Sequence, residues 1–202
     1  MSRLIKYSIL FTIISSFIFC QAKAKHIRDS WQHPAQIMDS IGVKPGMIIG
    51  EAGAGDGYFT FHLSNRIGVE GKIYANDIVN SKLEDIREHC EENNIKNIAT
   101  ILGEEKDPLF PVGQMDMVVM MYVFHDLTKP VPFLVNIKKC LKPGATVVII
   151  DRDPERYGEQ YDHFMKKSEI LEEIKKANYI LLDIKTFLPR DNIYIAKPAN
   201  LN

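Results

Sequence analysis

The sequence has little of what disulfide-rich, metal-finger or strongly charged proteins depend on. Its 202 residues include three cysteines and one tryptophan, and 25 basic residues nearly balance 26 acidic ones. Cys90 and Cys140 fall within apolar stripes of predicted helices, which favours buried small side chains over a disulfide and offers no metal-site spacing. A formal net charge of −1 provides no broad basic surface for nucleic acid or anionic lipid. The expected partner is therefore a small molecule, and no nucleic acid.

The N-terminal apolar run is too short to span a bilayer as a helix, which needs about 20 residues. Arg3 and Lys6 precede the 13 residues from Tyr7 to Phe19, and Ala22-Lys23-Ala24 follows them. A basic start, an apolar stretch and an A-x-A ending are typical of a secretory signal. Residues 1–24 are therefore predicted to be a signal peptide that exports the chain to the periplasm or the cell exterior. The alternative is an uncleaved anchor, with the cytoplasmic face of the membrane not excluded and with membrane contact through this segment alone.

No internal repeat and no low-complexity segment is present in the remaining sequence. The hydrophobic content of 46% and charged content of 25% are ordinary for a globular protein, and the length suits a single domain. Residues 25–33 are predicted to be a polar linker, and residues 34–198 to be the domain.

Strand and helix patterns alternate through this domain. Strands are expected at residues 47–49, 72–75, 98–102, 117–121, 145–150, 179–187 and 193–196; helices at 59–67, 81–93, 133–141 and 168–177, after a short helical segment opened by Pro34. Alternation of this kind favours a Rossmann-like, doubly wound α/β fold with a mostly parallel seven-stranded sheet. The link Pro189-Arg190-Asp191-Asn192 between the last two strands is too short for a crossover, so these strands are expected to form a C-terminal antiparallel hairpin.

A glycine-rich turn, Glu51-Ala52-Gly53-Ala54-Gly55-Asp56-Gly57, stands between a predicted buried strand and a predicted helix. Glycine permits close approach of the backbone to a ligand, and the first N–H groups of a helix are free to bind polar atoms. Tyr58 stands where a dinucleotide fingerprint has its third glycine, and the turn lacks the G-K-[ST] ending of a P-loop. Glu51 would repel a pyrophosphate but suits a cationic amino group. A nucleotide that carries an amino acid is therefore favoured over NAD.

An acidic residue, Asp77, ends the second predicted strand. A carboxylate at this place can accept two hydrogen bonds from a ribose diol. The alternative is a solvated aspartate that caps the following helix. The glycine-rich turn favours the ribose interpretation.

These motifs together resemble the class I methyltransferases that depend on S-adenosylmethionine (SAM). The resemblance covers residues 34–197 and rests on Lys44-Pro45-Gly46, the glycine-rich turn, Asp77 and Leu141-Lys142-Pro143-Gly144. Within that family the chain is similar to small type 11 methyltransferase-like proteins, some of which carry export signals. The resemblance implies SAM as the cofactor.

The resemblance also implies roles for particular residues. The residues implied to bind the cofactor are Glu51, Gly53, Ala54, Gly55, Gly57, Asp77, Ile78 and Glu104. Of these, Glu51 and the backbone of residues 53–55 would hold the methionine moiety, Asp77 the ribose hydroxyls and Glu104 the adenine. In the loop after the third strand, Glu105 or Asp107 could replace Glu104.

Polar and aromatic residues follow the fourth predicted strand in the run Tyr122-Val123-Phe124-His125-Asp126. His125 is the candidate general base with Asp126 to orient it. The alternative is that His125 lines the substrate pocket or contacts SAM. Tyr122, Arg152 and Tyr157 are further candidate substrate residues, although the segment 151–167 could equally be a solvated charged loop. No H-x-x-x-H spacing indicates a metal site.

The sequence thus predicts an enzyme that transfers a methyl group from SAM to a small-molecule acceptor. Such a transfer requires no covalent enzyme intermediate, which agrees with the lack of a nucleophile motif such as G-x-S-x-G. Two alternatives remain: a non-catalytic SAM-binding module, and an NAD-linked oxidoreductase with a degraded fingerprint.

Overall fold

The structure, a computed structural model, describes residues 27–156 and 163–199. The predicted signal segment 1–24 and Tyr157 lie outside the described residues. The chain divides into two units, with the boundary between Pro34 and Ala35. In the first unit, residues 27–32 are helical where a polar linker is predicted. No helix in the described ranges is both long and apolar enough to cross a membrane.

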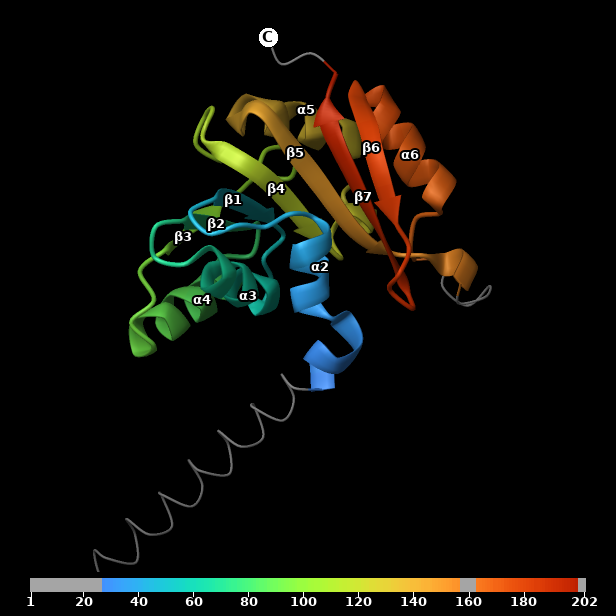
Figure 1. Ribbon diagram of the computed structural model, residues 1–202. Helices are drawn as coiled ribbons and strands as arrows, with labels where there is room; N and C mark the ends of the chain where they lie inside the picture. The colour runs from blue at the N-terminus through green and yellow to red at the C-terminus, as the bar shows by residue number, and fades with distance from the viewer. Residues whose placement is uncertain (1–26, 157–162, 200–202) are drawn as a thin grey trace, which may run out of the picture. The chain divides into compact units, whose positions relative to one another are not determined.

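The second unit alternates strands and helices (Figure 1). The strands are β1 (Ile48–Ala52), β2 (Lys72–Asp77), β3 (Ile98–Leu102), β4 (Met115–Met121), β5 (Leu141–Arg152), β6 (Tyr179–Lys185) and β7 (Asp191–Pro198). The α-helices are α2 (Pro34–Ser40), α3 (Tyr58–Ile67), α4 (Asn80–Glu92), α5 (Pro130–Ile137) and α6 (Lys167–Lys176). Short 3-10 helices cover Phe124–Asp126 (η1), Lys138–Cys140 (η2) and Pro154–Arg156 (η3).

All seven strands form one sheet in the order β3-β2-β1-β4-β5-β7-β6. Neighbouring strands from β3 to β5 run parallel, whereas β7 is antiparallel to both β5 and β6. The mostly parallel, doubly wound sheet and its terminal hairpin are therefore confirmed. Strand order reverses between β1 and β4, and ligands of such sheets bind beyond the carboxyl ends of the strands at this point.

Helices cover both faces of the sheet, because two apolar clusters form on opposite sides of it. Residues of α2, α3 and α4 belong to one cluster, and residues of α5 and α6 to the other. Strand β4 contributes to both: Met117 and Val119 face the first cluster, and Val118 and Met120 the second. A strand segment buried on both faces needs apolar residues at every position, which explains the apolar run from Met117 to Met121 in β4.

The segment Leu141–Gly144, predicted as a turn after a helix, is instead the start of β5. The helix ends earlier, at Ile137, and η2 leads directly into the strand. Met115 pairs with Leu141 and Met117 with Thr146, so the residues between them form an irregularity that Gly144 permits with a φ of 81°.

Two smaller features refine the sequence analysis. The N-cap of α6 is Lys166, so the helix begins at Lys167, one residue before its predicted start at residue 168. The Glu169 carboxylate accepts the Lys166 backbone N–H at 2.6 Å. Cys90 and Cys140 are both free, and burial raises the pKa of the Cys140 thiol to about 12. Cys140 therefore acts as a small apolar side chain.

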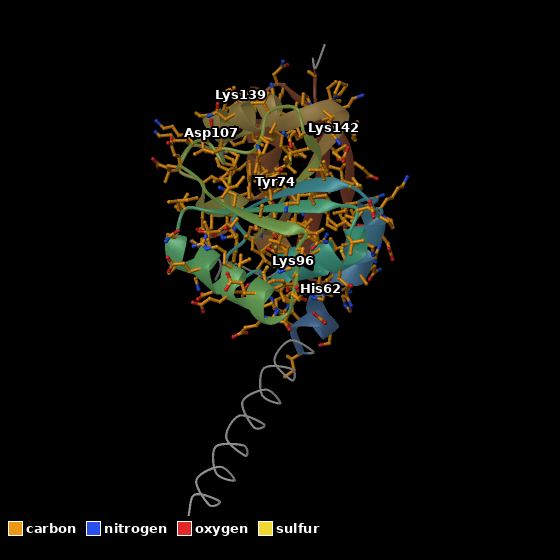
Figure 2. All side chains as sticks on the ribbon, turned by 90° about the vertical axis from the view of Figure 1, so that its left-hand side faces the viewer. His62, Tyr74, Lys96, Asp107, Lys139 and Lys142 are labelled. Carbon is orange, nitrogen blue, oxygen red and sulfur yellow. The ribbon has the colours of Figure 1, made fainter. Side chains whose placement is uncertain are left out.

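Two lysines, one in η2 and one at the start of β5, form ion pairs with aspartates; Figure 2 labels both lysines and one of the aspartates, Asp107. Lys142 lies 2.7 Å from Asp116 of β4, and Lys139 lies 3.9 Å from Asp107. Both pairs are exposed or half-exposed, so each contributes at most about 1 kcal/mol to stability.

Candidate active site

The glycine-rich turn has backbone conformations that require glycine. Gly53, Gly55 and Gly57 have φ values of 75°, 53° and 77°, in the left-handed region that side chains disfavour. A Cβ on Gly53 would lie 2.5 Å from Cγ2 of Val123, whereas one on Gly55 would meet no atom within 4 Å. Gly53 therefore allows close contact with the segment after β4, and Gly55 borders open space that a ligand can occupy.

The backbone N–H groups of this turn are partly used within the fold. Gly53 and Ala54 both donate to the Asn76 carbonyl, at 2.9 and 2.8 Å. Gly55 donates to Asp77 Oδ2 at 2.9 Å. The turn after β1 is thus bound to the end of β2, and the structure brings together two regions that the sequence assigned to one cofactor.

Asp77 lies at this junction, where its second oxygen accepts the Val79 backbone N–H at 2.9 Å. Each carboxylate oxygen has further lone pairs, so Asp77 can still accept hydrogen bonds from a ribose diol. Ile78 beside it is 62% exposed, which leaves an apolar side chain available to a ligand at the same edge. This arrangement fits the ribose of SAM.

Glu51 is buried, and its Oε2 accepts a hydrogen bond from Thr60 Oγ1 of α3 at 2.5 Å. A buried carboxylate is costly without such partners, and a cationic group placed against it would be attracted. The predicted role of Glu51 at the SAM amino group is compatible with this position and stays a prediction.

The three acidic candidates for the adenine differ in their surroundings. Glu105 accepts a hydrogen bond from Thr128, and the Asp107 carboxylate accepts the Leu109 N–H at 2.9 Å. Glu104 is exposed, and only its backbone pairs with Asp107, in an isolated bridge. Glu104 thus has the carboxylate least engaged by the fold, as its predicted role requires.

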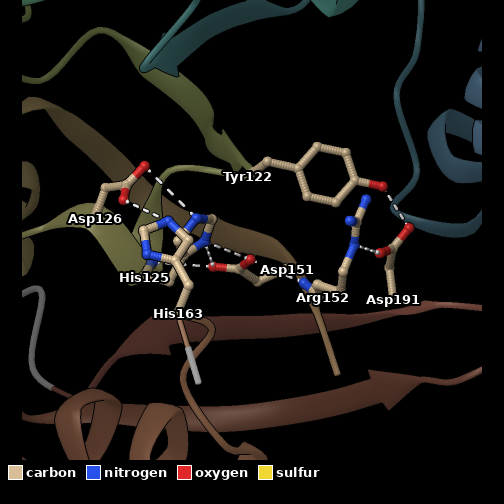
Figure 3. A network of polar contacts seen from close by, with 7 residues as sticks. All are labelled: Tyr122, His125, Asp126, Asp151, Arg152, His163 and Asp191. Atoms are coloured by element: carbon tan, nitrogen blue, oxygen red, sulfur yellow. Dashed lines mark hydrogen bonds and ion pairs between the residues drawn. The ribbon is translucent and has the colours of Figure 1, made fainter. Parts of the chain in front are cut away.

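His125 is fixed by Asp151, not by Asp126 as predicted from the sequence (Figure 3). His125 Nδ1 lies 2.7 and 3.0 Å from the two Asp151 oxygens, and the His125 backbone N–H donates to Asp151 at 3.0 Å. Asp126 instead lies 3.5 Å from Nε2, on the other side of the ring. A carboxylate on Nδ1 leaves the Nε2 lone pair free to accept a proton, so the geometry suits a base or a ligand.

Tyr122 and Arg152, two of the predicted substrate residues, meet at Asp191 (Figure 3). Tyr122 has a φ of 57° and donates its hydroxyl to Asp191, while Arg152 Nε lies 3.7 Å from that carboxylate. The Arg152 guanidinium also lies 5.5 Å from the centre of the Tyr122 ring. Contacts of this kind hold both side chains in one orientation at the carboxyl ends of β4 and β5.

Asp151 and Asp191 are site residues that the sequence analysis missed. Asp151 was placed only at a strand end, and Asp191 in the connection between the last strands, yet both are 1% exposed. One signal was available: each is a carboxylate at the end of an apolar strand, Ala145 to Ile150 or Ile193 to Ala196. Their partners lie 26 and 69 residues away in the sequence, which no local pattern reveals.

Burial raises the pKa of Asp191, and the Tyr122 hydrogen bond and Arg152 only partly oppose this. A raised pKa in the folded state means that the contribution of Asp191 to stability is lost as pH rises through that value. Asp191→Asn replaces this carboxyl group by an amide, which does not titrate. We expect the free energy of unfolding of this variant, relative to the wild type, to increase from acid to neutral pH.

Urea denaturation across this pH range measures the trend. Asp183→Asn is the matched control, since Lys185 lowers the pKa of exposed Asp183 and the trend there should have the opposite sign. A difference between Asp191→Asn and wild type that does not change with pH would contradict the prediction.

Comparisons with known proteins agree with this geometry. The family model described as "Methyltransferase domain" matches residues 43–187. The chain is 31% identical over 123 residues to a demethylmenaquinone methyltransferase of Lactococcus lactis, covering 61% of this chain and 48% of that protein. It is 26% identical over 115 residues to a ubiquinone/menaquinone biosynthesis C-methyltransferase of Vibrio parahaemolyticus, covering 56% and 44%. The chain therefore spans about half the length of these curated relatives.

Solved structures show the same fold. A SAM-dependent methyltransferase from Aquifex aeolicus superposes with a TM-score of 0.78 at 25% identity, over 84% of this chain and 91% of the other. A geranyl diphosphate C-methyltransferase from Streptomyces coelicolor A3(2), solved with S-adenosyl-L-homocysteine, superposes with a TM-score of 0.68 at 14% identity, over 85% and 79%. Because the family model covers more than half of the chain, and a SAM-dependent methyltransferase shares its fold over 84% of the chain, the chain belongs to the SAM-dependent methyltransferases.

Proposed function

We propose that this chain transfers the methyl group of SAM to a small-molecule acceptor held beyond the carboxyl ends of β4 and β5. The observation that carries the proposal is the contact between Gly53 and Val123, where no side chain larger than hydrogen fits. Val123 lies between Tyr122 and the η1 residue His125 in the sequence. A cofactor bound on the glycine-rich turn would therefore lie next to the polar groups predicted to contact the acceptor.

SAM supplies an activated methyl group on a sulfonium ion, whose displacement leaves a neutral product. The task left to the chain is to align the acceptor with that methyl group and to exclude water. Asp77 would hold the ribose, and Glu51 the cationic amino group. Tyr122 and Arg152, fixed by Asp191, would form one wall of the acceptor site, and His125 would bond an acceptor hydroxyl through Nε2.

A hydroxylated aromatic ring, methylated at carbon, is the acceptor class that we favour. The curated relatives carry names of menaquinone and ubiquinone methyltransferases, including C-methyltransferases. In this chain, Arg152 lies over the rings of Tyr122 and Phe164, at 5.5 and 5.1 Å from their centres. Aromatic faces beside a cation and an imidazole suit a flat ring with hydroxyl groups.

Thermal unfolding of the full-length chain with SAM or S-adenosylhomocysteine tests the cofactor assignment. Ligand at about 100 times its dissociation constant adds about 2.7 kcal/mol of stability, which corresponds to a rise in Tm of roughly 5–10 °C for a domain of this size. NADH should give no shift. The absence of a shift with either SAM or its product at millimolar concentration would contradict the proposal.

Methyl transfer is tested separately, with SAM labelled in the methyl group and a reduced quinone lacking one ring methyl. We expect labelled product from the wild type, and none from a variant that no longer binds SAM. A Tm shift without transfer to any such ring would instead support a non-catalytic SAM-binding module. Export or anchoring by residues 1–24 stays a prediction, and a fusion of that segment to a reporter enzyme tests it.

A further inference from the structure

The side chains of His125, Asp126 and His163 converge, and methyl transfer as proposed gives no role to Asp126 or His163. His125 Nε2 lies 3.5 Å from Asp126 Oδ2, and His163 Nε2 lies 3.2 Å from Asp126 Oδ1. One ligand atom from each residue lies within 4.8 Å of the others. Figure 3 shows both imidazole rings directed toward Asp126. We propose that His125, Asp126 and His163 bind one zinc ion, although no metal is expected from the sequence.

The distances are close to those of a metal site. Tetrahedral zinc with bonds of about 2.0–2.1 Å to nitrogen and oxygen separates neighbouring ligand atoms by about 3.3 Å. The two histidine nitrogens lie 3.2 and 3.5 Å from Asp126, close to this separation, although each approaches a different oxygen of that carboxylate. Asp126 and His163 are more than half exposed, so their side chains can rotate to complete the set at little cost.

A buried contact between His125 and Asp151 distinguishes this cluster from a surface ion pair. The side chains of His125 and Asp151 are 5% and 1% exposed, and Nδ1 bonds the Asp151 carboxylate at 2.7 Å. That carboxylate is itself held by the backbone N–H groups of His125 and Arg152. Histidines that bind metal almost always donate the other ring N–H to such a carboxylate, which fixes the tautomer and directs Nε2 at the ion.

A neighbouring ring further fixes the imidazole. Phe164 packs edge to face against His125, with 4.5 Å between ring centres. His163 lies next to it in the chain and also lines a pocket of about 440 Å³ with Phe164 and residues of α6. Of the three proposed ligands, His163 therefore borders open space from which an ion can approach.

The ligand types favour zinc over magnesium or calcium. Imidazole suits zinc and its neighbours in the first transition row, whereas magnesium and calcium prefer an all-oxygen set. Three protein ligands leave a fourth position open, as in catalytic zinc sites. The set carries one negative charge, so a bound Zn²⁺ retains a net positive charge toward that position.

The open position suggests a role for the ion, and this part alone rests on the proposed function. Zinc lowers the pKa of a bound hydroxyl, so an acceptor hydroxyl would bind as the oxyanion and release its proton to water. An oxyanion on the ring makes the ring carbons more nucleophilic toward the methyl group. With zinc on Nε2, His125 would position the acceptor through the metal and would not act as its base.

The test titrates the full-length chain, stripped of metal with chelator, with Zn²⁺ and in parallel with Co²⁺. We expect one Zn²⁺ bound per chain, and visible d–d absorption of tetrahedral intensity with Co²⁺. His163→Ala should weaken Zn²⁺ binding at least about 100-fold, because two ligands remain, and its exposed position should leave folding unchanged. Asp151→Asn, which keeps all three ligands, should weaken it roughly 10–100-fold.

His89→Ala is the matched control, since His89 is an exposed histidine on α4 outside the cluster. This variant should bind Zn²⁺ like the wild type. The inference is overturned if no stoichiometric Zn²⁺ binds, or if binding survives His163→Ala unchanged. The Tm shift with S-adenosylhomocysteine, measured on the same samples, reports cofactor binding independently, so failure of the zinc site and failure of the proposed function can be distinguished.

Discussion

Gly53→Ala is expected to lower the free energy of unfolding by roughly 2–5 kcal/mol and to abolish the Tm shift with SAM. A side chain at a φ of 75° costs about 1–2 kcal/mol. The added Cβ would also lie 2.5 Å from Val123 Cγ2, and overpacking of this kind costs about 1–3 kcal/mol. Relief of the overlap must move the glycine-rich turn or the segment after β4, and either shift displaces groups predicted to bind SAM.

Chemical denaturation and SAM titration of four variants, Gly53→Ala, Gly42→Ala, Val123→Ala and the double variant at positions 53 and 123, separate the two causes. Gly42→Ala has nearly the same φ, 77°, but no atom within 4 Å of the new Cβ, so it should show the backbone cost alone. Val123→Ala combined with Gly53→Ala should recover only the part of the steric cost that comes from the Val123 methyl groups, because Cβ of residue 123 stays 2.7 Å from the new Cβ. A double-mutant cycle measures this part as a coupling energy. If Gly53→Ala costs no more than Gly42→Ala and retains the SAM shift, the close contact with Val123 has no functional importance.

Asp77→Ala should weaken SAM binding by about 10²–10⁴-fold, the effect of losing two hydrogen bonds from a ribose diol to a charged acceptor. The variant also loses the acceptor of the Gly55 and Val79 N–H groups, so a moderate loss of stability should accompany it. Isothermal titration calorimetry with S-adenosylhomocysteine measures the affinity.

Asp116→Ala is the control for that loss of stability. Asp116 also accepts a backbone N–H, from Ile48 at 2.8 Å, but at the amino-terminal end of β1. This variant should lose stability to a similar degree and bind S-adenosylhomocysteine normally. Equal affinity of Asp77→Ala and wild type would exclude the ribose role of Asp77.

Much of the fold was predictable because its signals are local. The apolar run of β4, the glycines after β1 and the short link before the last strand each depend on neighbours in the sequence. The start of β5 was not predictable in this way, because Lys142-Pro143-Gly144 has the composition of a turn and only pairing with β4 extends the strand. Tertiary pairing here overrides a local preference.

The candidate site was predictable in part for the same reason. Gly53, Gly55 and Asp77 follow two strands whose carboxyl ends share one edge, so fold class alone brings them together. The partners of His125 and Tyr122 come from β5 and β7, and the choice of Asp151 over the adjacent Asp126 depends on side-chain direction. His163 lies 38 residues after His125, so the ligand set has no motif spacing.

A crystal structure of the chain with S-adenosylhomocysteine tests the central claim most directly. The account predicts ribose hydroxyls on Asp77, the amino group against Glu51 and the sulfur directed toward the Tyr122–Asp126 segment. A ligand bound elsewhere, or one whose sulfur is enclosed by protein with no space toward His125 for an acceptor, would contradict it.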